Sequence, residues 1–442
     1  MSSQPDLAGT ARLRIVSLAA GLSFLCSSLL EYALPLYFPA AGLPDSAWER
    51  WGTRSIFAWM CGPAIAALVA SRIGERRAWA LGLLCYVVLP GILYAIPLAG
   101  PWSLYVLDLA ALWYGSVAAL IWIGGISLAQ IVPHRRKSLS NASTMTAVAL
   151  GAAVAPQIGR LLVGSGTEAA GARAADFHGL LVFYPGVAAI GSMLVLLWGQ
   201  RIGHPDDPAT PEADQTHASL RSAPALLRSK RFLATMLALG LLTGPVFQAT
   251  NVYRAYRAAE PHIGLIVGSA DRGFSLLQSA GYAGQLLGGL LIGLLAGRQA
   301  NRVTGALILG AFTLCQLATG IAPNAVVLIV SAGLFEMMRQ LIRWSQTGFI
   351  SELVPQEQRA PAVSMTVMLS GLGGWLFMLL SRALQTPDTP HFSSALPFLI
   401  ATASGVLGVV LLLLTHRVVS SRSRSRWFTR SSSRPTGTVR EI

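Results

Sequence analysis

Several charged side chains lie inside long apolar segments of this 442-residue chain. The acids are Glu31, Asp108 and Glu336, and the arginines include Arg254 and Arg339. A charge at membrane depth costs at least a few kcal/mol if it faces lipid, so each group should have a partner or line a polar cavity. Arginine binds anionic groups through paired hydrogen bonds, and a carboxylate can carry a proton. These residues indicate anion binding and proton carriage.

Two segments, 232–256 and 324–350, each carry one polar stripe at helical spacing. Two arginines one turn apart beside a single carboxylate leave a positive charge, which an anionic substrate group can balance. The alternative interpretation is a structural ion pair between Glu336 and one of these arginines. We predict that the stripe residues bind the substrate: Gln248, Asn251 and Arg254 in the first segment, and Glu336, Arg339, Gln340 and Arg343 in the second.

Glu31 and Asp108 are the two candidates for carrying a coupled proton. Each is a carboxylic acid within an apolar segment, and no histidine competes with them inside a segment of this kind. The missing histidines also argue against a membrane-embedded enzyme, which needs a nucleophile and base or a metal at one depth. No catalytic residue is therefore expected.

The segments that hold these residues belong to a membrane protein. Only 12% of the residues are charged, against about a quarter in soluble domains, and the mean hydropathy is +0.56. The net charge of +14 comes mainly from arginines between the apolar segments, without a base-stacking motif, so no nucleic-acid partner is expected. The four cysteines show no paired spacing, and neither a metal site nor a cofactor is expected.

Twelve apolar segments of membrane-spanning length can be counted. They predict an N-terminal half of six helices (residues 1–200), a linker (201–231), a C-terminal half of six helices (232–415) and a basic tail (416–442). The expected spans are 14–38, 53–71, 78–99, 102–131, 140–163, 179–200, 232–256, 274–297, 303–322, 324–350, 361–382 and 393–415.

Basic residues gather at both ends of the chain, in the linker and on alternate connections. This bias places both termini and the linker in the cytoplasm, and an even number of spans agrees with it. We expect an integral protein of the cell (inner) membrane whose tail touches the anionic lipid surface.

The two halves repeat each other at a spacing near 222 residues. Pro133 and Pro355 share local sequence at this spacing, and the same shift takes Gly151 onto Gly373. The basic loops "ASRIGERR" and "AGRQANR" also correspond, with Arg72 against Arg298 and Arg76 against Arg302. Transporters built from such repeats bind their substrate near the midplane, between the halves.

With these motifs the chain resembles the major facilitator superfamily over nearly its whole length. The family's loop G-x-L-x-D-R-x-G-R-R is matched by Arg72, Gly74 and Arg76, and Arg77 follows. Ser71 replaces the family's aspartate, so the gating role of that aspartate does not carry over.

The segment "GAAVAPQIG" is similar to a pattern frequent in proton-driven exporters of the family. Gly151, Pro156 and Gly159 match it. The resemblance implies gating roles for both motifs, including Arg298 and Arg302 in the second half. It also implies an all-α membrane fold of two pseudo-symmetric six-helix bundles, with the charged spans lining a central cavity.

These observations predict a secondary active transporter that works by alternating access. No Walker-type ATP-binding loop is present. The favoured substrate is a small organic anion or zwitterion, with H⁺ as coupling ion, and we expect a monomer in the lipid bilayer. One alternative is a proton-coupled exporter of amphipathic cations or drugs. Another is a transporter-like sensor that binds without translocating.

Overall fold

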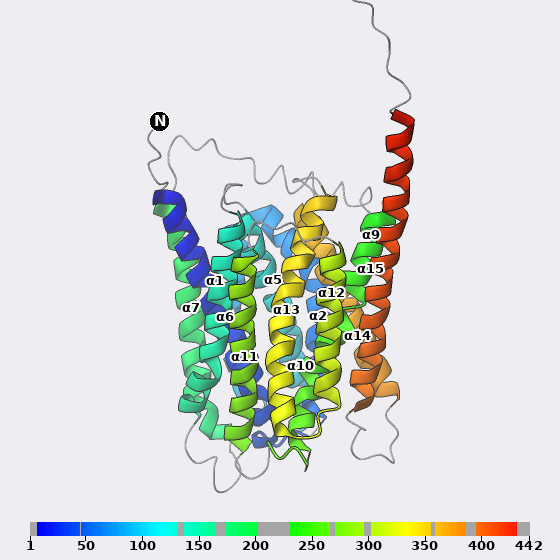
Figure 1. Ribbon diagram of the computed structural model, residues 1–442. Coiled ribbons are helices and arrows are strands. Elements are labelled where there is room, and N and C mark those ends of the chain that lie inside the picture. The colour runs from blue at the N-terminus through cyan, green and yellow to red at the C-terminus, as the bar shows by residue number, and fades with distance from the viewer. Residues whose placement is uncertain are drawn as a thin grey trace, which may run out of the picture.

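Long apolar runs fold into long helices in the computed structural model of the protein. The regular structure in the parts of the chain that it describes is entirely helical (Figure 1). The structure describes residues 7–44, 46–130, 137–163, 174–201, 230–260, 262–265, 270–295, 302–354, 359–384 and 395–430.

The first half forms six rods. The third rod is split into α3 and α4 near Pro90, because proline cannot donate the backbone hydrogen bond that a continuous helix requires. Short 3-10 helices, η1 (Gly100–Trp102) and η4 (Ala174–Phe177), lead into two of the rods. The α-helices are α1 (Leu7–Ala40), α2 (Ala47–Ile73), α3 (Glu75–Tyr86), α4 (Leu89–Ala95), α5 (Ser103–Gln130), α6 (Lys137–Leu162) and α7 (His178–Arg201).

The second half also forms six rods, and its first rod is interrupted. There α9 passes through a π-helical segment, η5, before α10 begins at a Gly-Pro pair. The elements are α9 (Lys230–Met236), η5 (Leu237–Leu241), α10 (Gly244–Ala259), α11 (Ala270–Leu294), α12 (Arg302–Gly320), α13 (Ala325–Leu353), α14 (Arg359–Ala383) and α15 (Ala395–Arg430).

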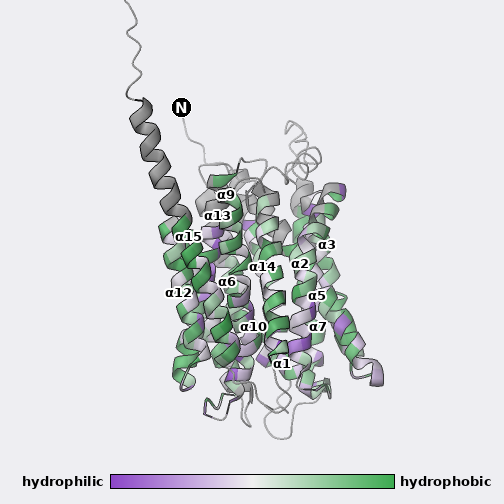
Figure 2. Ribbon diagram, turned by 90° about the vertical axis from the view of Figure 1, so that its right-hand side faces the viewer, coloured by the Kyte–Doolittle hydropathy of each residue, from purple (hydrophilic) through white to green (hydrophobic). Residues whose placement is uncertain are grey.

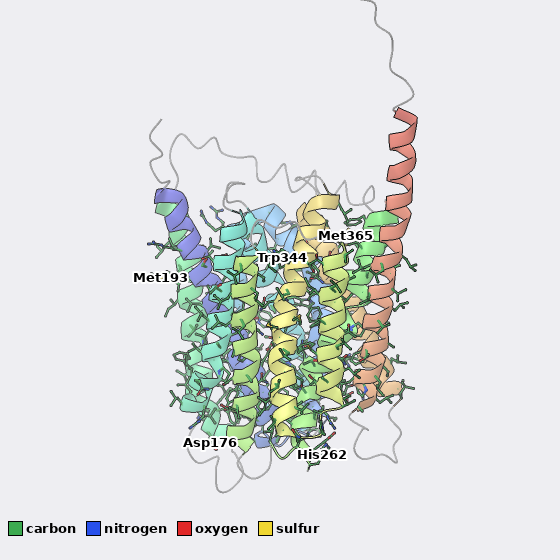
Figure 3. The ribbon with its side chains drawn as sticks, viewed as in Figure 1. Asp176, Met193, His262, Trp344 and Met365 are labelled. Atoms are coloured by element: carbon green, nitrogen blue, oxygen red, sulfur yellow. The ribbon has the colours of Figure 1, made fainter. Side chains whose placement is uncertain are left out.

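The start of α1 and the end of α15 lie at the same end of the molecule, which we call the terminal end (Figure 1). Asp176 and His262 lie at the opposite, distal end (Figure 3). The twelve rods confirm the expected all-α fold, although α15 continues as a helix to Arg430, beyond the predicted span 393–415. Within the described residues, nine helices are long and apolar enough to cross a membrane.

Hydrophobic residues are frequent along the outermost helices of the bundle, where the ribbon is largely green (Figure 2). Leu161, Val182 and Leu294 are each more than 70% exposed, while Trp79 and Tyr86 are almost fully buried. Exposed apolar side chains in such number suit a lipid environment, since in water they would form a large adhesive patch.

Two close helix crossings relate the halves to each other. In the first half α6 crosses α1, where a Cβ atom at Gly151 would lie 2.0 Å from the carbonyl oxygen of Gly21. In the second half α14 crosses η5, where a Cβ atom at Gly373 would lie 1.9 Å from the carbonyl oxygen of Leu241. The 222-residue repeat thus relates two crossings that both require glycine.

The halves pack against each other through α6 with α11 and through α2 with α14. These contacts leave α1, α5, α10 and α13 facing the space between the halves. The polar stripes predicted from the sequence lie on two of these helices, α10 and α13.

Candidate functional site

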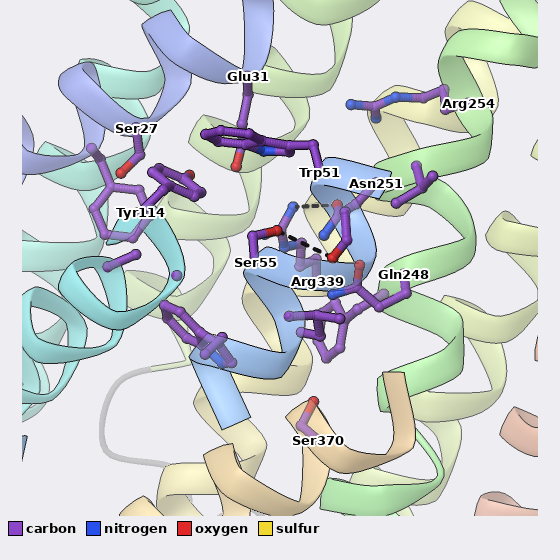
Figure 4. A pocket seen from close by; sticks show the side chains of 18 of the residues that line it. Ser27, Glu31, Trp51, Ser55, Tyr114, Gln248, Asn251, Arg254, Arg339 and Ser370 are labelled. Carbon is purple, nitrogen blue, oxygen red and sulfur yellow. Dashed lines mark hydrogen bonds between the residues drawn. The ribbon is translucent and has the colours of Figure 1, made fainter. Parts of the chain in front are cut away.

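A cavity of about 260 Å³ lies between the two halves. Its lining side chains come from α1, α2, α3 and α5 of the first half and from α10, α11, α13 and α14 of the second. In Figure 4, Ser27 and Tyr114 lie on one side of the cavity and Gln248 and Arg254 on the other. A concave site with few polar groups among apolar ones is typical of small-molecule binding.

Glu336 holds two arginines at the edge of the cavity. Arg254 donates from Nη1 to Glu336 Oε1 at 3.3 Å, and Arg339 donates from Nη1 to the two carboxylate oxygens at 3.2 and 3.1 Å. The side chains of Glu336, Arg254 and Arg339 are 3%, 9% and 12% exposed. One carboxylate thus serves two guanidinium groups, and both lie where water screens charge poorly.

Glutamines of α11 complete this cluster from behind. Gln285 donates to Glu336 Oε2 at 2.7 Å, and Arg254 donates from Nη2 to Gln278 Oε1 at 3.1 Å. Gln340 is fully buried and donates to Gln285 at 3.5 Å. Glu336 and Gln340 therefore face α11 rather than the cavity, which their neighbours Arg339 and Arg343 line.

Arg339 keeps hydrogen-bonding capacity. Its Nη1 donates to Asn251 Oδ1 at 3.4 Å, and its guanidinium lies 5.7 Å from the centre of the Phe247 ring. The buried Nε has no hydrogen-bond partner among the residues that the structure describes. Gln248, Asn251 and Arg343 also line the cavity. The sequence-predicted stripes therefore meet at one site, where their donors can receive an anion.

Glu31 lies on the opposite wall of the cavity, exposed within it. It is about 14 Å along α1 from Ala40, and Glu336 is about 16 Å along α13 from Ala325, so the two acids lie at similar depth. No hydrogen bond joins Glu31 to another residue in the described ranges. The arginines of α10 and α13 and Glu336 act on it electrostatically.

Asp108, the second predicted proton carrier, is not among the residues that line the cavity. It accepts two hydrogen bonds from Arg50, from Nε at 2.7 Å and from Nη2 at 2.6 Å, and Arg54 Nε lies 3.5 Å from its Oδ1. These pairs join α5 to α2 near the distal end. The Asp108 side chain is 18% exposed, and two arginines of α2 hold it outside the cavity.

The predicted gating residues are dispersed. Gly74 forms the turn between α2 and α3 with φ of 83°, a conformation that favours glycine, and Arg72 and Arg77 beside it are exposed. Arg76 is partly buried. Pro156 and Gly159 lie on the buried face of α6, where Gly159 packs against the Tyr32 ring. Arg298 lies outside the described residues, and Arg302 begins α12.

Two hydrogen bonds join the halves at the distal side of the cavity. Trp48 Nε1 donates to the carbonyl oxygen of Val252 at 3.1 Å, and the Tyr253 hydroxyl donates to Glu49 at 3.0 Å. These consecutive pairs join the first turn of α2 to the last turns of α10. We call these two pairs the distal latch.

Sequence reasoning missed the latch and the α11 glutamines. Gln278 and Gln285 are seven residues apart in an apolar helix, a spacing that puts them on one face and could have identified them. Trp48 and Glu49 precede the predicted second span, 53–71, whereas α2 begins at Ala47. No cluster of potential metal ligands occurs within the described part of the chain.

Comparison with known proteins supports the family resemblance over most of the chain. The family model described as Major Facilitator Superfamily matches residues 16–378. A sequence comparison with curated proteins gives no match.

Solved transporters share the fold at low identity. A variant of the E. coli fucose:proton symporter FucP is 14% identical over 91% of this chain and 99% of its own, with a TM-score of 0.59. The nucleoside transporter NupG is 16% identical (92% and 99% covered, TM-score 0.61), and the human organic anion transporter MFSD10 is 15% identical (92% and 100%, TM-score 0.61). By the match of its family model, the chain belongs to the major facilitator superfamily.

Proposed function

We propose that this transporter carries a small organic anion together with protons, by alternating access of its two halves. The observation behind the proposal is the surplus of positive charge in the cavity. Arg254, Arg339 and Arg343 line the cavity together with Glu31, and Glu336 pairs with two of these arginines from behind. One positive charge is left over when both acids are ionised. A substrate with one anionic group balances it without burying an unpaired charge.

Glu31 is the proposed proton carrier. It is exposed in the cavity, whereas Asp108 is held by two arginines outside it. Protonation of Glu31 removes a negative charge facing the substrate arginines, so proton and anion binding strengthen each other, as symport requires. The groups of the second half that act electrostatically with Glu31 are Arg254, Tyr282, Glu336, Arg339 and Arg343. Those of the first half are Tyr86 and Tyr114.

We place both termini and the linker 201–231 in the cytoplasm, on the arginine bias of the sequence. The distal latch then closes the outer side, and the cavity belongs to a state that opens inward. Single cysteines at Ser219 and Ser432 test this orientation. Labelling of either by an impermeant reagent outside intact cells would reverse it.

The names of two structural relatives agree with this proposal. FucP is described as a proton symporter and MFSD10 as an organic anion transporter. At 14% and 15% identity they share only the fold with this chain. The charges in the cavity, rather than the likeness, therefore carry the proposal.

Counterflow of labelled organic anions in proteoliposomes tests it. We expect Arg339→Lys to weaken substrate binding about ten- to a hundredfold, because an ammonium cannot reproduce the planar fork and a charged hydrogen bond contributes about 1.5–3 kcal/mol. Arg160→Lys is the matched control, because Arg160 is exposed on α6 and does not line the cavity. Anion counterflow that survives Arg339→Lys unchanged, or counterflow of cations alone, would favour the cation exporter.

Glu31→Gln tests the coupling. The wild type should bind the anion more tightly as pH falls, since protonation of Glu31 removes the opposing charge. Glu31→Gln should bind it with the low-pH affinity at every pH, exchange substrate normally and lose uptake driven by a pH gradient. Asp108→Asn should keep the pH dependence. Gradient-driven uptake by Glu31→Gln at the wild-type rate contradicts the assignment.

A further inference from the structure

The two halves line the cavity with side chains of different chemistry. Aromatic residues are eight of the thirty that line the cavity but only 8% of the chain, so rings are concentrated there. All three lining arginines come from the second half. Six of the eight aromatic residues come from the first: Phe24, Trp48, Trp51, Trp59, Tyr86 and Tyr114.

The aromatic wall is built on buried supports. The rings of Tyr86 and Tyr114 stack with centroids 6.0 Å apart and planes 9° apart, and Trp51 lies 5.5 Å from Tyr114. Ser27 Oγ and the Tyr86 hydroxyl share a hydrogen bond of 3.1 Å. Tyr86 and Trp51 are buried, so they fix the position of Tyr114 before any ligand arrives.

Other rings of this wall keep part of their surface in the cavity. Phe24, Trp48, Trp59 and Tyr114 are half-buried rather than buried. Rings that serve only to pack helices have no need to line a cavity. An apolar ligand surface placed on these rings would release water from both, which favours binding.

We propose that the transported anion is an aromatic monocarboxylic acid. Its ring lies on the wall formed by Trp59 and Tyr114, and its carboxylate meets Arg339 and Arg343. A single carboxylate balances the one surplus positive charge that the site carries when both acids are ionised, and protonation of Glu31 strengthens the attraction for it further. The inference rests on the proposed function, to which it adds the substrate class.

The size of the cavity agrees with this class. A dry cavity of roughly 150 Å³ is known to hold benzene in a protein interior. The cavity here, at about 260 Å³, has room for one ring and a short acid side chain.

Binding to the purified full-length protein tests the inference without a transport step. Calorimetry would compare phenylacetate, 3-phenylpropanoate and indole-3-acetate with acetate and propanoate. 3-Phenylpropanamide and 3-phenylpropylamine would test the need for the anionic group. We expect at least one aromatic acid to bind about tenfold or more tightly than its aliphatic counterpart, and the amide and amine to bind weakly.

Variants locate the effect on the wall. Tyr114→Leu should reduce the preference for aromatic over aliphatic acids about tenfold, whereas Tyr114→Phe should preserve that ratio. Tyr105→Leu is the control, because Tyr105 is exposed on α5 outside the cavity. Trp59→Leu replaces Tyr114→Leu if the latter fails to fold.

The possible outcomes distinguish a failure of this inference from a failure of the proposed function on which it rests. If acetate and propanoate bind as tightly as every aromatic acid, and Arg339→Lys weakens them, the substrate class is wrong and anion transport stands. If the amine binds and no acid does, both proposals fail. A preference for aromatic acids that is unchanged in both Tyr114→Leu and Trp59→Leu also overturns the inference.

Discussion

At the scale of single residues, the central feature is one buried carboxylate between two guanidinium groups. Glu336 contacts Arg254 and Arg339 and is itself only 3% exposed. Removing one member of such a cluster leaves a buried charge unmatched, which costs more than the pair contributes. Both a structural and a binding role predict this cost, so stability and affinity must be measured separately.

We expect Glu336→Gln to destabilise the protein by about 3–5 kcal/mol, because two buried arginines then lack a countercharge. The double variant with Arg254→Gln should recover most of this loss, since it restores the net charge of the site. Thermal unfolding of the detergent-purified variants measures both effects. Asp176→Asn, at the distal end, is the control. A double variant no more stable than the single one would show that the two charges do not compensate each other.

The polar stripes could be predicted from sequence because charged and amide side chains stand out in apolar helices. The sequence could not predict which residues of a stripe line the cavity and which pack against a neighbouring helix. Arg339 and Arg343 line the cavity while Gln340 packs against α11, and that depends on how α13 is rotated against its neighbour. The role of Asp108 was hidden for the same reason, because its partners Arg50 and Arg54 come from another helix.

At the scale of elements, the close crossings make the two halves equivalent. Helical glycines permit carbonyl oxygens to approach within the space of a missing Cβ atom. Sequence alone predicted the correspondence of Gly151 and Gly373, because both keep their place in the repeat. It could not predict their partners, since η5 and α1 share no motif that marks them as crossing helices.

Gly373→Ala should therefore be destabilising, although alanine is the better helix former by about 1 kcal/mol. The new Cβ atom would lie 1.9 Å from the carbonyl oxygen of Leu241, so α14 and η5 must separate, at a cost of about 1–3 kcal/mol or more. Gly186→Ala is the control, because its new Cβ atom meets nothing within 4 Å. Equal melting temperatures for the two variants would contradict a tight crossing.

The boundaries of the elements were predicted less well than their number. The interruption between α9 and α10 is a π-helical segment, a feature often found at functional sites. No sequence pattern predicted it. It lies beside the crossing with α14, where the helix that carries Gln248 and Arg254 begins. Its position favours a bending point for the cavity-lining part of α10.

At the scale of the whole molecule, function requires two states of similar free energy. The halves meet through α2 with α14 and α6 with α11, so these pairs can act as the surfaces on which one half rocks against the other. In the present state the distal latch joins the two halves. Its hydrogen bonds are few, and weakening one should shift the populations without unfolding the protein.

Tyr253→Phe should thus favour the state that is open at the distal end. The hydroxyl donates to Glu49 at 3.0 Å, and a hydrogen bond to a charged group contributes about 1.5–3 kcal/mol, so the distal-open population should rise about tenfold or more. Ser370 lines the cavity and can report access as Ser370→Cys in a variant without the four native cysteines. An impermeant thiol reagent applied from the distal side should label Tyr253→Phe faster, and from the terminal side more slowly. Tyr105→Phe is the matched control, and equal labelling of both variants from both sides would show that the latch does not set the balance between states.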